Sequence, residues 1–361
     1  MVSNSLMRRY FPALSLALLA TLFLQPARLA ADLIWTPQGG WRMEGGVLGG
    51  LDTTDGRNAL DFMNKGRTAE EAGHDRAALK AYLTVSRKYP NSVFAAEALY
   101  RTGVIYQKRQ QYFKAFDTYQ SMVSRYPNSE KFNQVIGEQY RIASQLFEGK
   151  RNRIFAWLPG FKNRERAIGY FETIVHTAPY SDYSPLALMN AARGYHQVGE
   201  TEAAIDALDR MINTYPRSTL TPDAYLKIAQ THASLVDGPY YDQKSTKEAI
   251  TYYEDYMILF PGDAGMASAE KGLIEMKTVL AKSKLTMADY YYKYRKNYKA
   301  AKVIYNEAIT VYPDSELAAQ ARAKLVDVEA KLEQQTNLSG KTPAATPATP
   351  EPKKKKHFLF F

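Results

Sequence analysis

The sequence contains no cysteine in its 361 residues. This absence excludes disulfide bonds, thiolate ligands for metals and iron–sulfur clusters, and cysteine nucleophiles. It also leaves no cysteine in the sequence that could carry a lipid anchor. Outside residues 1–31, no segment approaches the roughly 18 apolar residues of a membrane-spanning helix. The hydrophobic content of 45% nevertheless suffices for a packed core, so the chain as a whole is not disordered.

A surplus of basic residues is also missing from the body of the chain. The formal net charge is +10, but three arginines within residues 1–31 contribute +3 of it, and the lysine-rich stretch 336–361 contributes +4. Because the excess lies at the two ends, the charge does not indicate a nucleic-acid-binding surface. We expect no nucleic-acid partner.

Residues 1–31 have the pattern of a secretory signal peptide. Arg8 and Arg9 precede an apolar run from Phe11 to Leu24, and small residues ending in Ala31 follow the run. A charged start, a short apolar stretch and a small-residue exit are the three parts of such a peptide. The run is too short to cross a bilayer comfortably, although an uncleaved anchor is the alternative. We therefore expect an exported protein whose mature form begins near residue 32.

A Tyr-Pro-x-Ser motif recurs along the chain. It occurs at 89–92, 126–129, 215–218 and 312–315, with weaker copies at 178–181 and 260–263. Between the motifs, apolar residues recur at helical spacing. Repetition at steps of about 40 to 50 residues is typical of a solenoid of stacked helices.

The repeats resemble tetratricopeptide repeats (TPRs) position by position. In the second unit, Gly103, Tyr106, Ala115, Tyr119 and Pro127 occupy the small, aromatic, alanine, aromatic and proline positions of that repeat. Small residues let the two helices of a repeat approach each other, aromatic residues fill the space between pairs, and proline ends the second helix. The sequence therefore predicts an all-α fold, a right-handed TPR superhelix of about six helix-pair repeats with a C-terminal capping helix over 315–335.

These patterns divide the chain into five segments. They are a signal peptide (1–31), an irregular Gly/Trp-rich leader held on the first helices by its two tryptophans (32–56), N-terminal TPR repeats (57–180), C-terminal TPR repeats (181–335), and a disordered Pro/Thr linker with a Lys-rich aromatic tail (336–361).

Two repeats are stretched by insertions between their helices, at 148–164 and 236–245. Insertions in solenoids become loops on one edge, often the binding edge. The first insertion carries Trp157 and Phe161 among five large apolar residues with basic neighbours, which are costly to expose without a partner. Two hypotheses stay open: the loop contacts a partner, or it folds back over the third and fourth repeats as a small satellite core.

No catalytic or metal-binding pattern is recognisable in the sequence. The five histidines lack metal-ligand spacing, and His232 takes the position of Tyr106 in a sister repeat, so we interpret it as a packing residue. Gly340-Lys341-Thr342 lacks the upstream glycine of a phosphate-binding loop, and no Gly-x-Ser-x-Gly nucleophile motif occurs. We expect a protein that is not an enzyme and needs no cofactor and no metal.

Two segments of the C-terminal half make the chain similar to the family of the outer-membrane protein assembly factor BamD. The first reads Asp242-Gln243-x-x-Thr246 and resembles that family's Asp-Gln-Thr insertion. The second reads Tyr291-Tyr292-x-x-Arg295-x-x-Tyr298 and is followed by a helix and the last Tyr-Pro-x-Ser motif. The resemblance covers about 181–335, whereas residues 57–180 match only the generic repeat.

The resemblance implies a non-enzymatic scaffold of the β-barrel assembly machine, periplasmic and associated with the outer membrane. Such proteins dock onto the POTRA domains of the barrel-forming subunit and receive unfolded outer-membrane proteins. Carried over by motif, the repeats around Arg295, with Tyr291 and Tyr298, would contact a POTRA domain. The concave groove of the N-terminal repeats would receive extended client segments.

Each of the carried-over residues also has a plain structural alternative. The Arg295 guanidinium could pair bidentately with a partner carboxylate, or it could only favour the dipole at a helix C-terminus. Asp242 and Gln243 are further candidate partner-binding residues, but Asp242 could instead order the loop or cap the next helix.

The chain departs from the family in three ways. It has no cysteine after the signal, about two more repeats, and a basic, aromatic tail. The tail, Lys353–Phe361, could rest on an anionic membrane surface or be a solvated, frayed end.

A different class of function also fits the repeats, namely a periplasmic adaptor of the Tol–Pal or cell-envelope type. Such adaptors usually carry a coiled coil before the repeats, and residues 32–56 are Gly-rich without heptads, which argues against this alternative.

Overall fold

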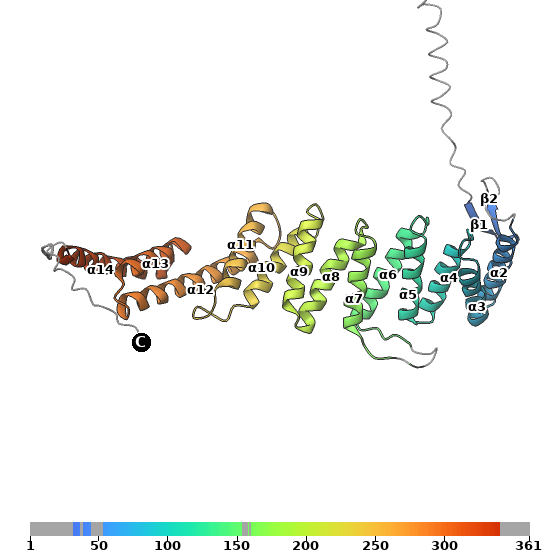
Figure 1. Cartoon of the computed structure of the whole chain (residues 1–361), viewed down its shortest axis with the longest axis horizontal. Helices are drawn as coiled ribbons and strands as arrows, with labels where there is room; N and C mark the ends of the chain where they lie inside the picture. Colours follow the sequence, from blue (N-terminus) through green and yellow to red (C-terminus); the bar gives the residue numbers. More distant parts are fainter. Residues whose placement is uncertain (1–31, 37–38, 45–52, 154–157, 159, 340–361) are drawn as a thin grey trace, which may run out of the picture. The chain divides into compact units, whose positions relative to one another are not determined.

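The computed structural model describes residues 32–36, 39–44, 53–153, 158 and 160–339 (Figure 1). The predicted signal peptide, the Lys353–Phe361 tail and Trp157 lie outside these residues. The described residues contain thirteen helices and one two-stranded sheet. They confirm the predicted all-α tetratricopeptide-repeat fold. The chain divides into two compact units, Met1–Gly199 and Glu200–Phe361. The boundary at 180/181, taken from the family resemblance, stays a prediction.

In the first unit, consecutive helices pack against each other and, among the described residues, bury apolar side chains in two clusters. The helices of this unit are α2 (Thr54–Glu71), α3 (Asp75–Lys88), α4 (Ala95–Lys108), α5 (Tyr112–Arg125), α6 (Phe132–Phe147), α7 (Arg164–Thr177) and α8 (Tyr183–Val198).

In the second unit, the helices again pack in chain order. They are α9 (Thr201–Thr214), α10 (Thr221–Ser234), α11 (Lys244–Leu259), α12 (Met266–Lys293), α13 (Tyr298–Val311) and α14 (Glu316–Ser339). The last helix runs beyond the predicted end at residue 335, so residues 336–339 are helical rather than part of a linker. No glycine or proline interrupts the pattern before Gly340, and the Thr336 hydroxyl donates to the Leu332 carbonyl at 2.9 Å.

The Tyr-Pro-x-Ser motif forms the turn after the second helix of a repeat. In its four full copies the serine N–H donates to the tyrosine carbonyl, at 3.0 Å for Ser92, Ser129 and Ser218 and at 3.3 Å for Ser315. The weaker copies make the same bond, from Ser181 to Ala178 at 3.0 Å and from Asp263 to Phe260 at 3.1 Å. Proline suits the second position of such a turn because its φ is fixed there and it needs no N–H donor. The sequence motif therefore marks one recurring turn.

The small and aromatic positions of the repeat meet as the sequence predicts. A Cβ atom on Gly103 in α4 would lie 2.2 Å from Cε1 of Tyr119 in α5, and a Cβ on Gly66 in α2 would lie 2.6 Å from Cε1 of Tyr82 in α3. Tyr82 and Tyr119 are completely buried. The glycines therefore let a tyrosine ring lie directly on the backbone of the neighbouring helix.

The segment before the first helix is a β-hairpin, and the expectation of an irregular leader is wrong for these residues. Strands β1 (Asp32–Thr36) and β2 (Gly40–Glu44) pair antiparallel, with Trp35 opposite Trp41. The turn is possible because Gly40 adopts a φ of +65°. Trp41 is 5% exposed and packs with Ala59 and Met63 of α2. The tryptophans thus hold the leader on the first helices, but as a strand pair.

Candidate functional site

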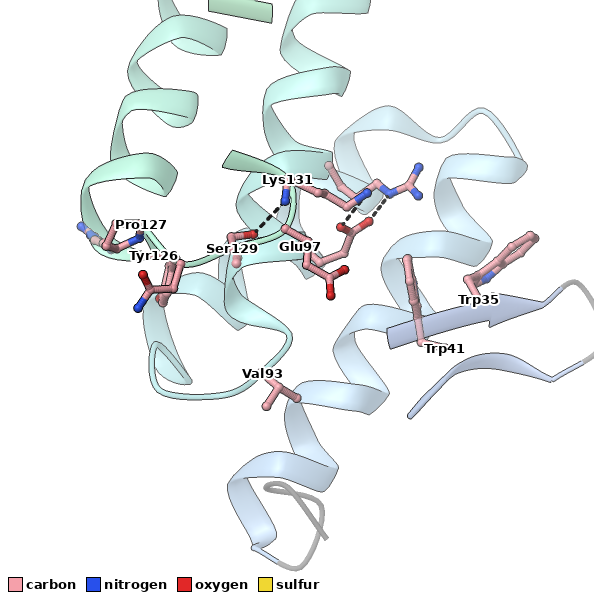
Figure 2. Close-up of a pocket in the computed structure, with 13 residues that line it drawn as sticks. Trp35, Trp41, Val93, Glu97, Tyr126, Pro127, Ser129 and Lys131 are labelled. Atoms are coloured by element: carbon pink, nitrogen blue, oxygen red, sulfur yellow. Dashed lines mark hydrogen bonds and ion pairs between the residues drawn. The ribbon is translucent and has the colours of Figure 1, made fainter. Parts of the chain in front are cut away.

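A hollow in the first unit lies between the hairpin and the helices that follow it (Figure 2). Its volume is about 950 Å³. The two strands contribute the indoles of Trp35 and Trp41, and α4 and the α5–α6 turn form the rest of the wall. The other lining residues are Val93, Ala96, Glu97, Arg101, Arg125, Tyr126, Pro127, Asn128, Ser129, Glu130 and Lys131. We call this hollow the hairpin pocket.

A buried carboxylate organises the charges of the hairpin pocket. Glu97 is 5% exposed and accepts a hydrogen bond from Nε of Arg101 at 2.8 Å, while Nζ of Lys131 lies 3.5 Å away (Figure 2). Burial alone would lower the pKa of Arg101, but the carboxylates of Glu97 and Glu70 outweigh burial and hold the pKa above its ordinary value. Arg101 therefore remains charged, and Arg101 and Lys131 share one carboxylate. Arg125, also in the wall, pairs with no carboxylate among the described residues.

The indoles of the pocket are fixed in place by cations and by backbone bonding. The Arg67 guanidinium lies 4.1 Å from the ring centroid of Trp35, and that of Arg101 lies 5.6 Å from Trp41. The backbone N–H of Trp41 donates to Oδ1 of Asn64 on α2 at 2.7 Å. Such contacts hold the half-buried indole of Trp35 in the wall, while the indole of Trp41 is packed in the core.

Sequence reasoning missed this pocket. One signal was present: Leu33-Ile34-Trp35-Thr36 and Trp41-Arg42-Met43 are β-favouring runs separated by Pro-Gln-Gly-Gly, which is a hairpin pattern. No signal marked Glu97, because a lone glutamate in the first turn of a helix looks like any solvated acid.

The predicted contact residue Arg295 lies in the short connection between α12 and α13. It is exposed, and its backbone N–H donates to the carbonyl of Tyr290 at 3.2 Å. Among the described residues, its guanidinium has no ion-pair partner. The side chain is therefore available for a partner, while its position just past a helix C-terminus fits the dipole alternative equally well.

The tyrosines near Arg295 divide into two groups. Tyr291 and Tyr298, both predicted contact residues, are half-buried and pack on the core of the last helices; the rings of Tyr292 and Tyr298 lie 5.7 Å apart. The exposed rings are instead Tyr290 at 49% and Tyr294 at 77%, which lie 5.9 Å apart. The structure therefore places Tyr291 and Tyr298 as supports of the turn and presents Tyr290 and Tyr294 beside Arg295.

The other predicted pair, Asp242 and Gln243, lies in the loop before α11. The Gln243 side-chain amide donates to the carbonyls of Gly238 and Tyr241, at 2.9 and 2.8 Å, and so closes the loop on itself. Asp242 is exposed, and α11 has Gln243 rather than Asp242 at its N-cap, without a side-chain cap bond. Gln243 is the loop-ordering residue, while Asp242 is exposed beside it.

The insertion between α6 and α7 is attached to the repeats at its base. Oδ1 of the buried Asn152 accepts a hydrogen bond from the Phe113 backbone at 3.1 Å, and the Arg153 N–H donates to the Gln110 carbonyl at 2.9 Å. Phe161 is 90% exposed, so its ring is not part of a satellite core. Trp157 lies outside the described residues.

In the described part of the chain, no three histidine or acidic side chains come together as metal ligands would. None of the helices there is both long and apolar enough to cross a bilayer. His232 stacks on Tyr252, with ring centroids 5.6 Å apart, and burial lowers its pKa. The pattern is that of a packing residue.

Comparison with known proteins places the likeness in two stretches. Residues 161–338 match the outer membrane lipoprotein family, and residues 97–129 match the tetratricopeptide repeat. Two curated relatives, both named outer membrane protein assembly factor BamD, come from Xylella fastidiosa strains 9a5c and Temecula1. Each is 22% identical over 176 residues, covering 46% of this chain and 60% of the relative. The matched stretch thus spans less than two thirds of those proteins.

The similar solved structures have low sequence identity to this chain. One is a tetratricopeptide repeat protein from Parabacteroides merdae, with 13% identity, a TM-score of 0.30, and coverage of 76% of this chain and 100% of that chain. Another is MamA from Desulfovibrio magneticus, with 15% identity, a TM-score of 0.29, and coverage of 58% and 99%.

Proposed function

We propose that this chain, a BamD-like tetratricopeptide repeat protein, is a non-enzymatic periplasmic scaffold in the assembly of outer-membrane β-barrel proteins. In this proposal its C-terminal repeats dock onto a POTRA domain of the barrel-forming subunit. Its N-terminal repeats receive extended segments of unfolded outer-membrane proteins, and the chain works at the periplasmic face of the outer membrane.

The observation that carries the docking proposal is the exposed turn between α12 and α13. Arg295 is exposed there, next in sequence to the exposed Tyr294 and bonded through its backbone N–H to the carbonyl of the exposed Tyr290, inside the stretch that matches the outer membrane lipoprotein family. Arginine and tyrosine are the residues that most often dominate the binding energy of protein interfaces. These exposed residue types support the proposal, and the turn that carries them is anchored because Tyr291 and Tyr298 pack on the core of the last helices.

Two further surfaces belong to the same proposal. The loop with Asp242 and Gln243 carries the exposed rings of Tyr240 and Tyr241, and the insertion exposes Phe161 beside the basic residues Lys162 and Arg164. We assign Asp242, Gln243, Trp157 and Phe161 to additional partner contacts. For the Lys353–Phe361 tail we propose peripheral contact with the membrane.

The test is a pull-down of the tagged mature chain from gently solubilised envelope, read by mass spectrometry. We expect a POTRA-bearing barrel protein in the eluate and a loss of about tenfold or more with Arg295→Ala, since a central interface arginine is worth about 2 kcal/mol or more. Lys271→Ala is the matched control, because Lys271 is an exposed cation on α12, away from the turn. It should leave recovery unchanged.

Other outcomes would overturn the proposal. Recovery of Tol–Pal or wall-associated proteins without a POTRA protein would favour the adaptor function. Equal recovery with Arg295→Ala and Lys271→Ala would remove Arg295 from the interface and leave only a role at the end of α12.

A further inference from the structure

The hairpin has one edge against the repeats and one edge directed away from them. The backbone N–H of Trp41 donates to Oδ1 of Asn64 on α2, so this amide points away from β1. Strand β2 also packs along α2, whereas β1 reaches α2 through the Trp35 ring beside Arg67. The edge of β2 is therefore the attached one, and among the described residues no helix packs along β1 in the same way.

The register of the strand pair fixes which groups β1 presents at its outer edge. Trp35 lies opposite Trp41, and Leu33 lies opposite Met43. Along an antiparallel strand pair, two kinds of opposite residues alternate. In one kind, the two residues exchange N–H···O=C bonds with each other; in the other kind, both residues direct their N–H and C=O groups away from the partner strand. Since the Trp41 N–H points outward, Trp35 and Leu33 also direct their N–H and C=O groups outward. The outer edge of β1 thus offers donors and acceptors at the spacing of a strand.

The hairpin pocket lies on one side of this edge. Opposite residues of an antiparallel pair lie on the same face of the sheet, and the indoles of Trp35 and Trp41 both line the pocket (Figure 2). In a strand added to β1, the side chains next to Trp35 would point toward the same face, and their neighbours would point to the other. The edge would bind the backbone, and the pocket would select alternate side chains.

These features define the occupant. Edge groups at strand spacing require an extended segment, and the half-buried indole of Trp35 favours a large apolar residue at the position beside it. The wall also holds Arg125, which has no carboxylate partner among the described residues, whereas Arg101 and Lys131 share Glu97. An acidic side chain on the pocket side complements that charge. The occupant is an extended, amphipathic segment of an unfolded client chain.

We infer that the hairpin binds such a client segment by strand addition to the outer edge of β1, with alternate apolar side chains directed toward the hairpin pocket. The inference rests on the proposed function, since it names the way in which the N-terminal repeats receive a client. It depends on the backbone of residues 33 and 35 and not on the turn at Arg295.

The test uses a fluorescent peptide of about eight residues, within the usual length of a strand, and the full mature chain. Phe and Leu alternate with Thr, and one glutamate takes an apolar-side position. Two further peptides carry N-methyl groups on either of the two alternating sets of amides. Strand addition uses only one set of amides. We therefore expect one methylated peptide to bind as the parent does and the other to lose affinity by about tenfold or more. Equal affinity of the two methylated peptides, measured by anisotropy, would overturn the inference.

A substitution in β1 itself tests the same edge through the protein instead of the peptide. Leu33→Pro deletes an outward N–H without removing a hairpin hydrogen bond, and proline is tolerated on an outer edge. We expect about tenfold weaker peptide binding with Leu33→Pro and binding within about twofold of the parent with Leu33→Ala, which keeps the N–H. Similar binding by both variants would contradict strand addition. If Leu33→Pro disturbs the hairpin, seen as a shift in tryptophan emission, the methylated peptides decide the question alone.

The two proposals can fail separately. Arg295→Ala should keep the peptide affinity, and Leu33→Pro should keep the recovery of a POTRA-bearing protein. If the peptide binds with the expected dependence on one set of amides while no POTRA-bearing protein is recovered, that result would contradict the proposed function and leave the inference intact. A second copy of the chain on the edge would appear as a dimer in light scattering that the peptide dissociates, and it would replace the client as the occupant.

Discussion

Nζ of Lys324 on α14 lies 2.8 and 2.7 Å from the two carboxylate oxygens of Asp289 on α12. The Tyr305 hydroxyl of α13 donates to the same carboxylate at 2.5 Å. Asp289 therefore joins the last three helices. We expect Lys324→Met to lower the free energy of unfolding by about 1–2 kcal/mol, because it removes the hydrogen-bonded cation from a half-buried carboxylate and leaves only the more distant Lys293, at 3.9 Å.

Another ion pair, which joins α13 to α14, supplies the control for this prediction. Lys302 and Glu329 lie 2.8 Å apart, but their side chains are 45% and 47% exposed. Glu329→Gln should cost about 0.5 kcal/mol or less, as exposed pairs do. Urea denaturation measures both variants, and equal costs would show that the Asp289 junction is only a surface pair.

The same junction predicts a pH dependence. Burial alone would raise the pKa of Asp289, but the hydrogen bonds from Lys324 and Tyr305 outweigh burial and hold the pKa below its ordinary value. A depressed folded-state pKa stabilises the fold above the unfolded value of about 3.9, and this contribution is lost as the pH falls through the folded value. The stability difference between the parent and Asp289→Asn should therefore be largest near pH 7 and shrink toward pH 3. A difference that stays constant would contradict the shift.

Two glycines give a matched test of the contact between helices within a repeat. Gly103→Ala would place a Cβ 2.2 Å from Tyr119, so we expect a loss of about 1–3 kcal/mol despite the better helix propensity of alanine. Gly169 in α7 has no atom within 4 Å of the same position, so Gly169→Ala should stabilise by about 0.5–1 kcal/mol. Thermal melts would show opposite shifts; a gain with both variants would mean that Tyr119 moves aside at little cost.

The exposed Phe161 separates binding from stability in the insertion. Since its ring is 90% exposed, Phe161→Ser should change the free energy of unfolding by about 0.5 kcal/mol or less. If the insertion contacts a partner, recovery in the envelope pull-down should fall. A lower melting temperature with unchanged recovery would contradict the interface hypothesis, and Trp157→Ser extends the same comparison to the neighbouring aromatic residue.

The fold could be read from the sequence where one residue type has one structural role. Proline follows the second helix in every clear repeat, and glycine faces tyrosine in the first two, so the helix pairs and their turns were predictable. The candidate site was harder, because tyrosines at neighbouring positions have different roles. Tyr291 is packed and Tyr294 is 77% exposed, and only the phase of α12 against α13 decides which is which. The hairpin was missed because the glycines that follow its two short β-favouring runs favoured an irregular Gly-rich leader over a strand pair.

The stretch that matches the outer membrane lipoprotein family and the stretch that folds as a unit have different borders. The matching stretch begins at residue 161, but Ile168 and Phe171 of α7 are buried in the core of the first unit together with Leu146 and Phe147 of α6. A fragment cut at the border of similarity would uncover those side chains to water. The border of the family match and the borders of the folded units therefore fall at different places in this chain. A fragment that carries the matching stretch must also keep the preceding repeats, against which α7 packs.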